Sequence, residues 1–305
     1  MIPVVIGISI FIFAVMQFSP GDPVRMMLGE RASVEDVEQM RQELGLDKPK
    51  VVQYFHYMGG VVLKGDFGIS YITRRPVIDE FRTKFPVTMK LAFLAMIIAI
   101  GIGIPVGIYS AIRPYSLFDK VATVLTLTGT SIPPFFLGLI LILIFSLGFK
   151  ILPSSGIEGW KSFILPAVTL SAITLTYLIR VTRASLLEVF REDYIRTARS
   201  KGLREYTIIT KHAFRNALIP VITTAGLQFG YMLGGAIITE TVFAIPGLGR
   251  LLVGAIRNAD LNVVLGTCLL LAVTFSFVNL LVDILYAFLD PRIKAQYSRS
   301  KKVAA

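Results

Sequence analysis

The residues best suited to chemistry are charged side chains in one polar segment, residues 185–218, between two apolar stretches. Seven basic and four acidic residues fall in this segment. Glycine permits the backbone of a tight turn, so we expect a short helix from Ile195 to Lys201, a turn at Gly202 and a second helix from about Glu205 to Leu218. A basic element of this kind can dock into a soluble partner or bind anionic lipid headgroups.

Motifs for enzymatic chemistry are absent from the sequence. It has no G-x-x-x-x-G-K-[ST] phosphate loop, no H-E-x-x-H zinc motif and no G-x-S-x-G nucleophile motif. The two histidines, His56 and His212, are predicted below to lie on opposite sides of a membrane, and the single cysteine, Cys268, falls in an apolar stretch. We therefore expect no catalytic residue, metal site or cofactor in this chain. Any ATP hydrolysis would belong to another polypeptide.

The composition places the polar segment in a membrane protein. Charged residues make up 17% of the 305 residues, hydrophobic residues 54%, and the mean hydropathy is +0.69. A soluble domain has about 25% charged residues, and a membrane span needs about 20 mostly apolar ones. The sequence therefore predicts an all-α polytopic membrane protein with six transmembrane helices. The expected spans are residues 1–18, 87–112, 120–148, 163–184, 219–240 and 263–289.

Charge distribution predicts the orientation. The net charge of +11 is concentrated in the 185–218 segment and in the tail, 291–305. By the positive-inside rule these parts and both termini are expected in the cytoplasm, and nucleic acid is not an expected partner. Residues 19–86 then form an extracytoplasmic loop region before the core of membrane spans, 87–290. In this loop Ser33 is expected to cap a helix that stops at Gly45, and a second amphipathic helix is expected over residues 51–62. The loop could be a lid on the bilayer or a docking surface.

Glycines and prolines mark several predicted spans. Glycines in span two and Pro133–Pro134 in span three are expected to interrupt those helices, as packing features or as hinges. In span five, a glycine at every fourth position favours close approach of another helix. The glycines of this face are Gly226, Gly230 and Gly234.

Polar residues follow helical spacing in the last two spans. In span five they lie roughly 200° from the glycine face, where they could line a path or bond to neighbouring helices. In span six they form one stripe, in which the carboxylate could face a path or reach the cytoplasmic interface. The candidate path residues are Thr224, Gln228, Tyr231, Ser276, Asn279 and Asp283.

The polar segment also contains a recognisable sequence motif. It reads Y-I-R-T-A-R-S-K-G-L over 194–203 and K-H-A-F-R-N-A-L-I-P over 211–220. This resembles the EAA loop of type I ABC importer permeases, in the form found in the dipeptide, oligopeptide and nickel transport group. The general E-A-A triplet is R-T-A here, which is usual in that group. Further matching motifs, such as P-G-D-P at 20–23 and E-T-V-F at 240–243, extend the likeness to the subunit with a long outside loop.

The resemblance implies partners and roles. They are a second permease, two ATP-binding subunits that hold ATP and Mg²⁺, an extracytoplasmic substrate-binding protein and membrane lipid. It implies that the segment 194–203 is a coupling helix seated in the ATPase, and that residues 240–249 form a re-entrant loop near an outer gate. Glycines and a proline between 246 and 254 predict non-helical structure there. The implied coupling residues are Tyr194, Arg196, Thr197, Ala198, Lys201, Gly202 and Leu203, with His212, Arg215 and Asn216 in support.

The expected function is thus the permease subunit of an ATP-driven importer for short peptides, in a bacterial or archaeal cell membrane. A nickel or nickel-chelate importer is the alternative within the same group. An ion-coupled secondary transporter would need intramembrane acids or an inverted repeat, and Asp283 is the only candidate acid we identify. A membrane-bound enzyme is disfavoured by the missing catalytic motifs.

Overall fold

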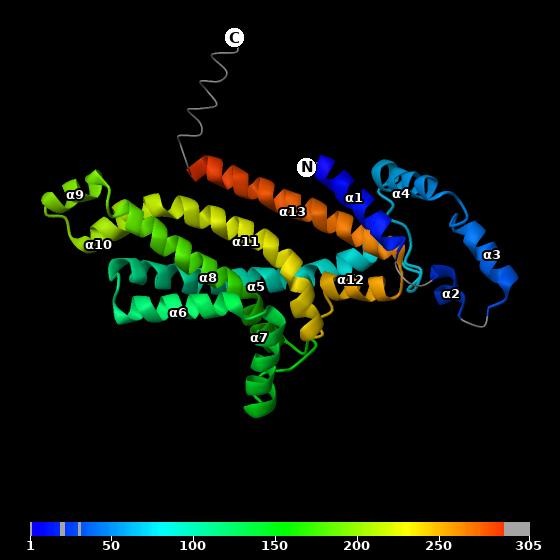
Figure 1. Ribbon diagram of the computed structural model, residues 1–305, viewed down its shortest axis with the longest axis horizontal. Coiled ribbons are helices and arrows are strands. Elements are labelled where there is room, and N and C mark those ends of the chain that lie inside the picture. The colour runs from blue at the N-terminus through cyan, green and yellow to red at the C-terminus, as the bar shows by residue number, and fades with distance from the viewer. Residues whose placement is uncertain (1, 19–21, 30–31, 290–305) are drawn as a thin grey trace, which may run out of the picture. The chain divides into compact units, whose positions relative to one another are not determined.

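The protein is helical almost throughout, in a computed structural model that describes residues 2–18, 22–29 and 32–289 (Figure 1). In this part of the chain one isolated bridge joins Ile69 to Pro76 and no strand forms. The tail 291–305 lies outside the described residues. The helices are α1 (Ile2–Met16), α2 (Pro23–Leu28), α3 (Val34–Glu43), α4 (Lys50–Lys64), α5 (Val77–Ile112), α6 (Leu117–Ser131), α7 (Pro134–Leu141), η1 (Ile142–Gly148), η2 (Trp160–Phe163), α8 (Ile164–Val189), α9 (Asp193–Ser200), α10 (Glu205–Thr207), η3 (Ile208–Ala213), α11 (Phe214–Val242), α12 (Leu248–Arg257) and α13 (Leu261–Leu289).

Four continuous helical stretches of the described chain are long and apolar enough to cross a membrane, which confirms an all-α polytopic membrane protein. They are Val77–Ile112, Trp160–Val189, Glu205–Val242 and Leu261–Val282. A fifth candidate is the pair Leu117–Ser131 and Pro134–Gly148, bent by 106° at the predicted proline break. The expected first span corresponds to α1, whose 15 residues fall short of the usual 20. The count of six spans therefore stays a prediction.

Helix α5 begins earlier than the sequence predicts, at Val77 and not at residue 87. Asp79 and Glu80 lie in its first turn, where carboxylates stabilise the positive end of the helix dipole. At 36 residues the helix is about 54 Å long, well beyond the roughly 30 Å of hydrocarbon. The last part of the expected 19–86 loop is therefore the first part of this helix.

The expected interruption of this helix by glycines is wrong, because α5 is continuous. Its glycines are instead places of close approach: a Cβ on Gly103 would lie 3.0 Å from Leu178 Cβ, and one on Gly107 would lie 2.7 Å from Thr182 Cβ. Both contacts are with α8. By contrast, a Cβ on Gly101 would meet no described atom within 4 Å.

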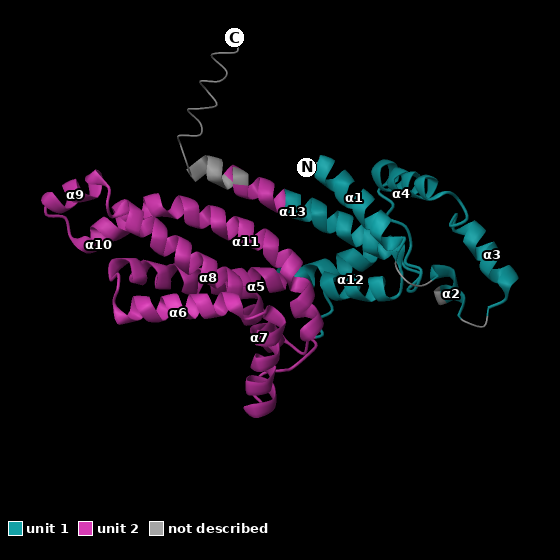
Figure 2. Ribbon diagram, in the orientation of Figure 1, with its two compact units in different colours: residues 1–89, 244–276 teal, residues 90–243, 277–305 magenta. Residues whose placement is uncertain are grey.

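The chain divides into two compact units (Figure 2). Unit 1 comprises residues 1–89 and 244–276. Here α3 and α4 form as predicted: the Ser33 hydroxyl accepts from the Asp36 amide at the start of α3, and Gly45 and Gly65 adopt the positive φ that ends each helix. Helix α4 is tied to α1 by a 2.7 Å hydrogen bond between Ser9 and Tyr54.

In unit 1 the expectation of non-helical structure over 246–254 is wrong, because residues 248–257 form helix α12. The amide of Leu248, at the first turn, donates to Thr88 Oγ1 at 2.9 Å. Leu248, Leu252 and Ala255 are buried at helical spacing. The burial of this apolar face outweighs the modest cost of about 1 kcal/mol for a glycine inside a helix. Only residues 243–247 form the break between α11 and α12.

Unit 2 comprises residues 90–243 and the chain from 277 onward. Helix α8 is its centre: it packs against α6, α7 and α11 (Figure 1). Its buried side includes Leu178, Leu186 and several threonines. Helix α8 ends at Val189, within the predicted polar segment 185–218, and α9 follows from Asp193.

Candidate functional site

Helix α9 is the centre of the 185–218 segment, and two of its side chains are buried. Ile195 is 0% and Ala198 8% exposed, three residues apart on one face. They pack in an apolar cluster with Leu186 of α8, Ala111 of α5 and residues of the next helices. These residues complete the cluster: Ile208, Ala213 and Ala217. Helix α9 is therefore held firmly on the ends of the longer helices.

The other face of α9 is polar and open. The side chains of Arg196 and Thr197 are exposed, and so are Lys201 and Gly202 just after the helix. Tyr194 and Leu203 are each 41% exposed. Of the predicted coupling residues, Ala198 is the exception, because it belongs to the buried cluster. Of the seven predicted coupling residues, one is therefore buried in the cluster and six are exposed.

The turn at Gly202 forms as the sequence predicts, with φ of +74°. The amide of Gly202 donates to the Arg199 carbonyl at 2.9 Å, and the amide of Leu203 donates to the Ala198 carbonyl at 3.3 Å. This pair of bonds is a Schellman motif, which closes the C-terminus of a helix. Across the turn, Arg199 Nε pairs with Glu205 Oε1 at 2.8 Å.

Among the predicted supporting residues, Asn216 makes the tie to α9. Its Nδ2 donates to Tyr194 Oη at 2.8 Å and to the His212 carbonyl at 3.2 Å. His212 is half-buried and Arg215 is exposed. The supporting contact therefore comes from the amide side chain and from the backbone of His212, and the orienting role assigned to Arg215 stays a prediction.

The second helix of the segment is not the single α-helix expected. It consists of α10, a π-helical stretch over Ile208–Ala213, and then α11, which continues through Pro220 into the fifth expected span. π-helical turns are rare and often lie at functional sites. The stretch contains His212 and Lys211, while Ile208 and Ala213 at its ends are buried in the cluster beneath α9.

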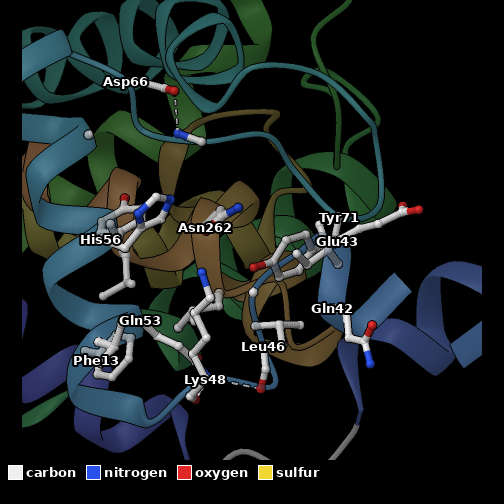
Figure 3. Close-up of a pocket in the computed structure, with 18 residues that line it drawn as sticks. Phe13, Gln42, Glu43, Leu46, Lys48, Gln53, His56, Asp66, Tyr71 and Asn262 are labelled. Atoms are coloured by element: carbon white, nitrogen blue, oxygen red, sulfur yellow. Dashed lines mark hydrogen bonds between the residues drawn. The ribbon is translucent and has the colours of Figure 1, made fainter. Parts of the chain in front are cut away.

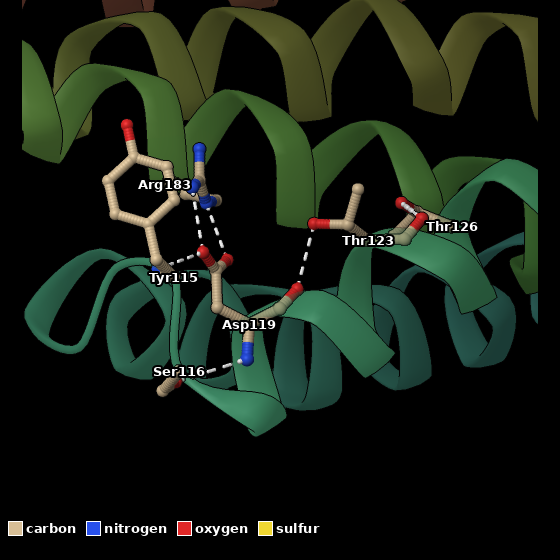
Figure 4. A network of polar contacts seen from close by, with 6 residues as sticks. All are labelled: Tyr115, Ser116, Asp119, Thr123, Thr126 and Arg183. Carbon is tan, nitrogen blue, oxygen red and sulfur yellow. Dashed lines mark hydrogen bonds and ion pairs between the residues drawn. The ribbon is translucent and has the colours of Figure 1, made fainter.

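An ion pair that the sequence does not predict joins α6 to α8 (Figure 4). Asp119, 3% exposed at the start of α6, binds Arg183 of α8 through Nε at 2.6 Å and Nη2 at 2.8 Å. The Tyr115 amide donates to the same carboxylate at 2.8 Å, and Ser116 caps the helix. The two partners are 64 residues apart. Their only sequence signal is a charge of each sign near the ends of two predicted spans.

The predicted glycine face of α11 makes a close contact at one position. A Cβ on Gly226 would overlap Val282 of α13, and Gly230 is buried. A Cβ on Gly234, however, would meet no described atom within 4 Å. Within this chain the close contact is therefore seen at Gly226, while Gly234 is exposed and its packing against another helix stays a prediction.

The predicted path residues remain untested as a path. On α11, Thr224 and Gln228 are half-buried and Tyr231 is 68% exposed, and the Thr224 hydroxyl donates to the Pro220 carbonyl at 2.8 Å. On α13, Ser276 and Asn279 are half-buried, and the side chain of Asp283 lies outside the described part. Asn279 Oδ1 is buried without a hydrogen-bond partner among the described residues. The described residues include no group of three or more His, Cys, Asp or Glu side chains that could hold a metal ion.

Two family models match most of the chain. Residues 103–295 match the family described as "Binding-protein-dependent transport system inner membrane component". Residues 1–92 match the N-terminal part of such membrane components. Together the matches cover both the long first loop and the segment that carries α9.

Curated relatives and solved structures agree with this match. The dipeptide transport system permease protein DppB of Escherichia coli K12 is 45% identical in an alignment 325 positions long, which covers 96% of each chain. The glutathione transport system permease protein GsiC of the same strain is 42% identical over 294 residues, again 96% of each. The inward-facing MetNI methionine ABC transporter superposes with a TM-score of 0.59 at 18% identity, over 70% of this chain and 97% of that one. At that identity the structural likeness shows the fold alone.

Proposed function

This chain belongs to the family of binding-protein-dependent transport system inner membrane components, the permease subunits of ABC importers, and we propose that it imports short peptides. Relatives named for dipeptides and for glutathione, each aligned over 96% of the chain, support a peptide substrate over nickel. The chain supplies the membrane path, and ATP hydrolysis is assigned to separate subunits that bind ATP and Mg²⁺.

The observation that carries the coupling mechanism is the two-faced helix α9. Ile195 and Ala198 fix it to the ends of α5, α8 and α11, while Arg196, Thr197 and Lys201 are left open. A rigid helix with an exposed polar face can seat in a cleft of an ATPase and pass its motion to the helices it is packed on. Because the cluster joins three long helices, a displacement of α9 would act on all of them together.

The proposed assembly contains a second permease, two ATPases and an extracytoplasmic binding protein in a bacterial or archaeal cell membrane. The excess of basic residues in 185–218 supports a cytoplasmic location for α9 and for both termini. The helices α3 and α4 then lie outside, where a binding protein could deliver substrate.

Substrate class is tested by uptake. In cells that lack other peptide importers, the complete system is expected to accumulate radiolabelled alanyl-alanine, and an ATPase subunit without its phosphate-loop lysine should abolish accumulation. Free Ni²⁺ and a nickel chelate serve as competing substrates. Uptake of nickel without uptake of any di- or tripeptide would overturn the peptide assignment and favour the nickel alternative.

Coupling is tested by cross-linking, which the single cysteine makes clean. In a Cys268→Ser background, Lys201→Cys is expected to form a disulfide with a cysteine placed in the docking groove of the ATPase, with a yield that changes when ATP is added. Lys64→Cys, at the end of α4 and predicted to lie outside, is the matched control and should not react. If Lys201→Cys gives no product while the subunits co-purify, α9 is not the docking helix.

A further inference from the structure

A cavity of about 330 Å³ lies within unit 1 (Figure 3). Its walls come from the end of α3, one face of α4, the strap of residues 65–76 and the start of α13. The volume lies near the lower end of the range for small-molecule sites, roughly 300–1,000 Å³. It belongs to neither α9 nor the predicted path residues.

The floor of the cavity is apolar and aromatic, with phenol groups as its polar atoms. Phe13 and Tyr71 are each 7% exposed and Leu265 is 1% exposed. The Tyr57 hydroxyl is buried without a hydrogen-bond partner in the described part of the chain. Burial raises the pKa of Tyr71 to about 12 and also raises the pKa of Tyr57, so both phenols remain protonated donors at neutral pH.

Hydrogen bonds fix the walls of the cavity, and one of them engages a charged group, because the Gly68 amide donates to Asp66 Oδ1 at 2.8 Å. Gln53 Nε2 donates to the Leu46 carbonyl at 3.0 Å and to the Lys48 carbonyl at 2.8 Å, which fixes the turn between α3 and α4. Asn262 Nδ2 donates to the Ile69 carbonyl at 2.9 Å, which fixes the strap on α13. A preformed cavity loses less entropy when a ligand binds.

The rim carries charges of both signs. Glu43 and Asp66 supply carboxylates, Lys48 supplies an ammonium group and His56 an imidazole, and all four side chains are exposed. None of them takes part in an ion pair within the described residues. Figure 3 shows His56, Asn262 and Tyr71 around the same space. Unpaired charges of opposite sign above an aromatic floor match a small ligand that carries both charges.

We propose that this cavity binds the zwitterion of a free dipeptide, as a subsite outside the membrane path. The peptide carboxylate would pair with Lys48, and its ammonium group would pair with Asp66 or Glu43. The inference rests on the peptide function proposed above and adds a second place where the chain itself contacts substrate.

The test uses the full-length chain in lipid nanodiscs, without the binding protein, and radiolabelled alanyl-alanine as the probe. Saturable binding is expected. Lys48→Gln and Asp66→Asn should each weaken it by about tenfold, the order that one hydrogen bond to a charged group contributes. Acetyl-alanyl-alanine amide, which has neither charge, should not compete.

Matched controls are Asp47→Asn and Lys64→Gln, exposed residues of the same loop that do not line the cavity, and both should bind like the unaltered chain. Absence of saturable binding to the unaltered chain overturns the proposal. Equal affinity in all four variants does so too.

Uptake by the complete importer separates the two hypotheses. If alanyl-alanine is transported but the isolated chain does not bind it, the cavity assignment fails and the peptide function stands. If the importer transports no peptide in the uptake assay, the function itself is wrong.

Discussion

An Asp119→Ala substitution is expected to lower the free energy of unfolding by about 3 kcal/mol, because it strands a charged partner. The Arg183 guanidinium would lose both of its bonds at 2.6 and 2.8 Å, and the Tyr115 amide would lose its acceptor. Thermal unfolding of the detergent-solubilised chain can be followed by a thiol-reactive dye, since Cys268 is the single, partly buried cysteine.

Two further variants show whether the loss comes from the buried pair. Asp79→Ala removes an exposed pair with Arg82, 3.8 Å apart, and should change stability by less than about 1 kcal/mol. The double variant Asp119→Leu with Arg183→Met removes both charges and should recover much of the stability lost in Asp119→Ala. An Asp119→Ala chain that unfolds at the same temperature as the unaltered protein would show that this ion pair does not hold α6 to α8.

A Gly107→Ala substitution is the second change with a large expected effect. Its new methyl group would lie 2.7 Å from Thr182 Cβ and 2.8 Å from the Ile179 carbonyl oxygen, so α5 and α8 must move apart. Overpacking of this kind costs about 1–3 kcal/mol. The same thermal assay should show a lower unfolding temperature and a smaller yield of folded chain.

Gly101→Ala is the matched control for this substitution. It lies on the same helix and its Cβ would meet no described atom within 4 Å. Because alanine favours a helix over glycine by about 1 kcal/mol, this control should be neutral or slightly stabilising. Equal destabilisation by both substitutions would mean that the loss at Gly107 does not come from its contact with α8.

The sequence predicted best those features that depend on neighbouring residues. The Ser33 cap, the glycine stops of α3 and α4, the bend at Pro133–Pro134 and the turn at Gly202 are all local, and all four form as expected. The exposed face of α9 also follows from local spacing. The sequence motif of α9 indicates the family without any knowledge of the fold.

Features that join distant parts of the chain were missed or misread. Nothing local pairs Asp119 with Arg183, and glycines such as Gly107 look the same whether they break a helix or admit a neighbour. Pro246 and the nearby glycines favour a break over 246–254, but the spacing of Leu248, Leu252 and Ala255 favours a helix, and the burial of these three residues decides the outcome. Sequence patterns supply candidates for these roles, and tertiary contacts select among them.

The π-helical stretch over Ile208–Ala213 has a consequence for insertions and deletions in this family of chains. A π turn holds one residue more than the α turn it replaces. A chain one residue shorter here could close as a regular α-helix with the side chains of α11 in their present phase, because the π turn takes up the extra residue within one turn. One residue lost from the regular part of α11 would instead rotate every later side chain of that helix by about 100°. The stretch Ile208–Ala213 is therefore a place where the chain can lose one residue without changing which row of α11 side chains faces a given neighbour.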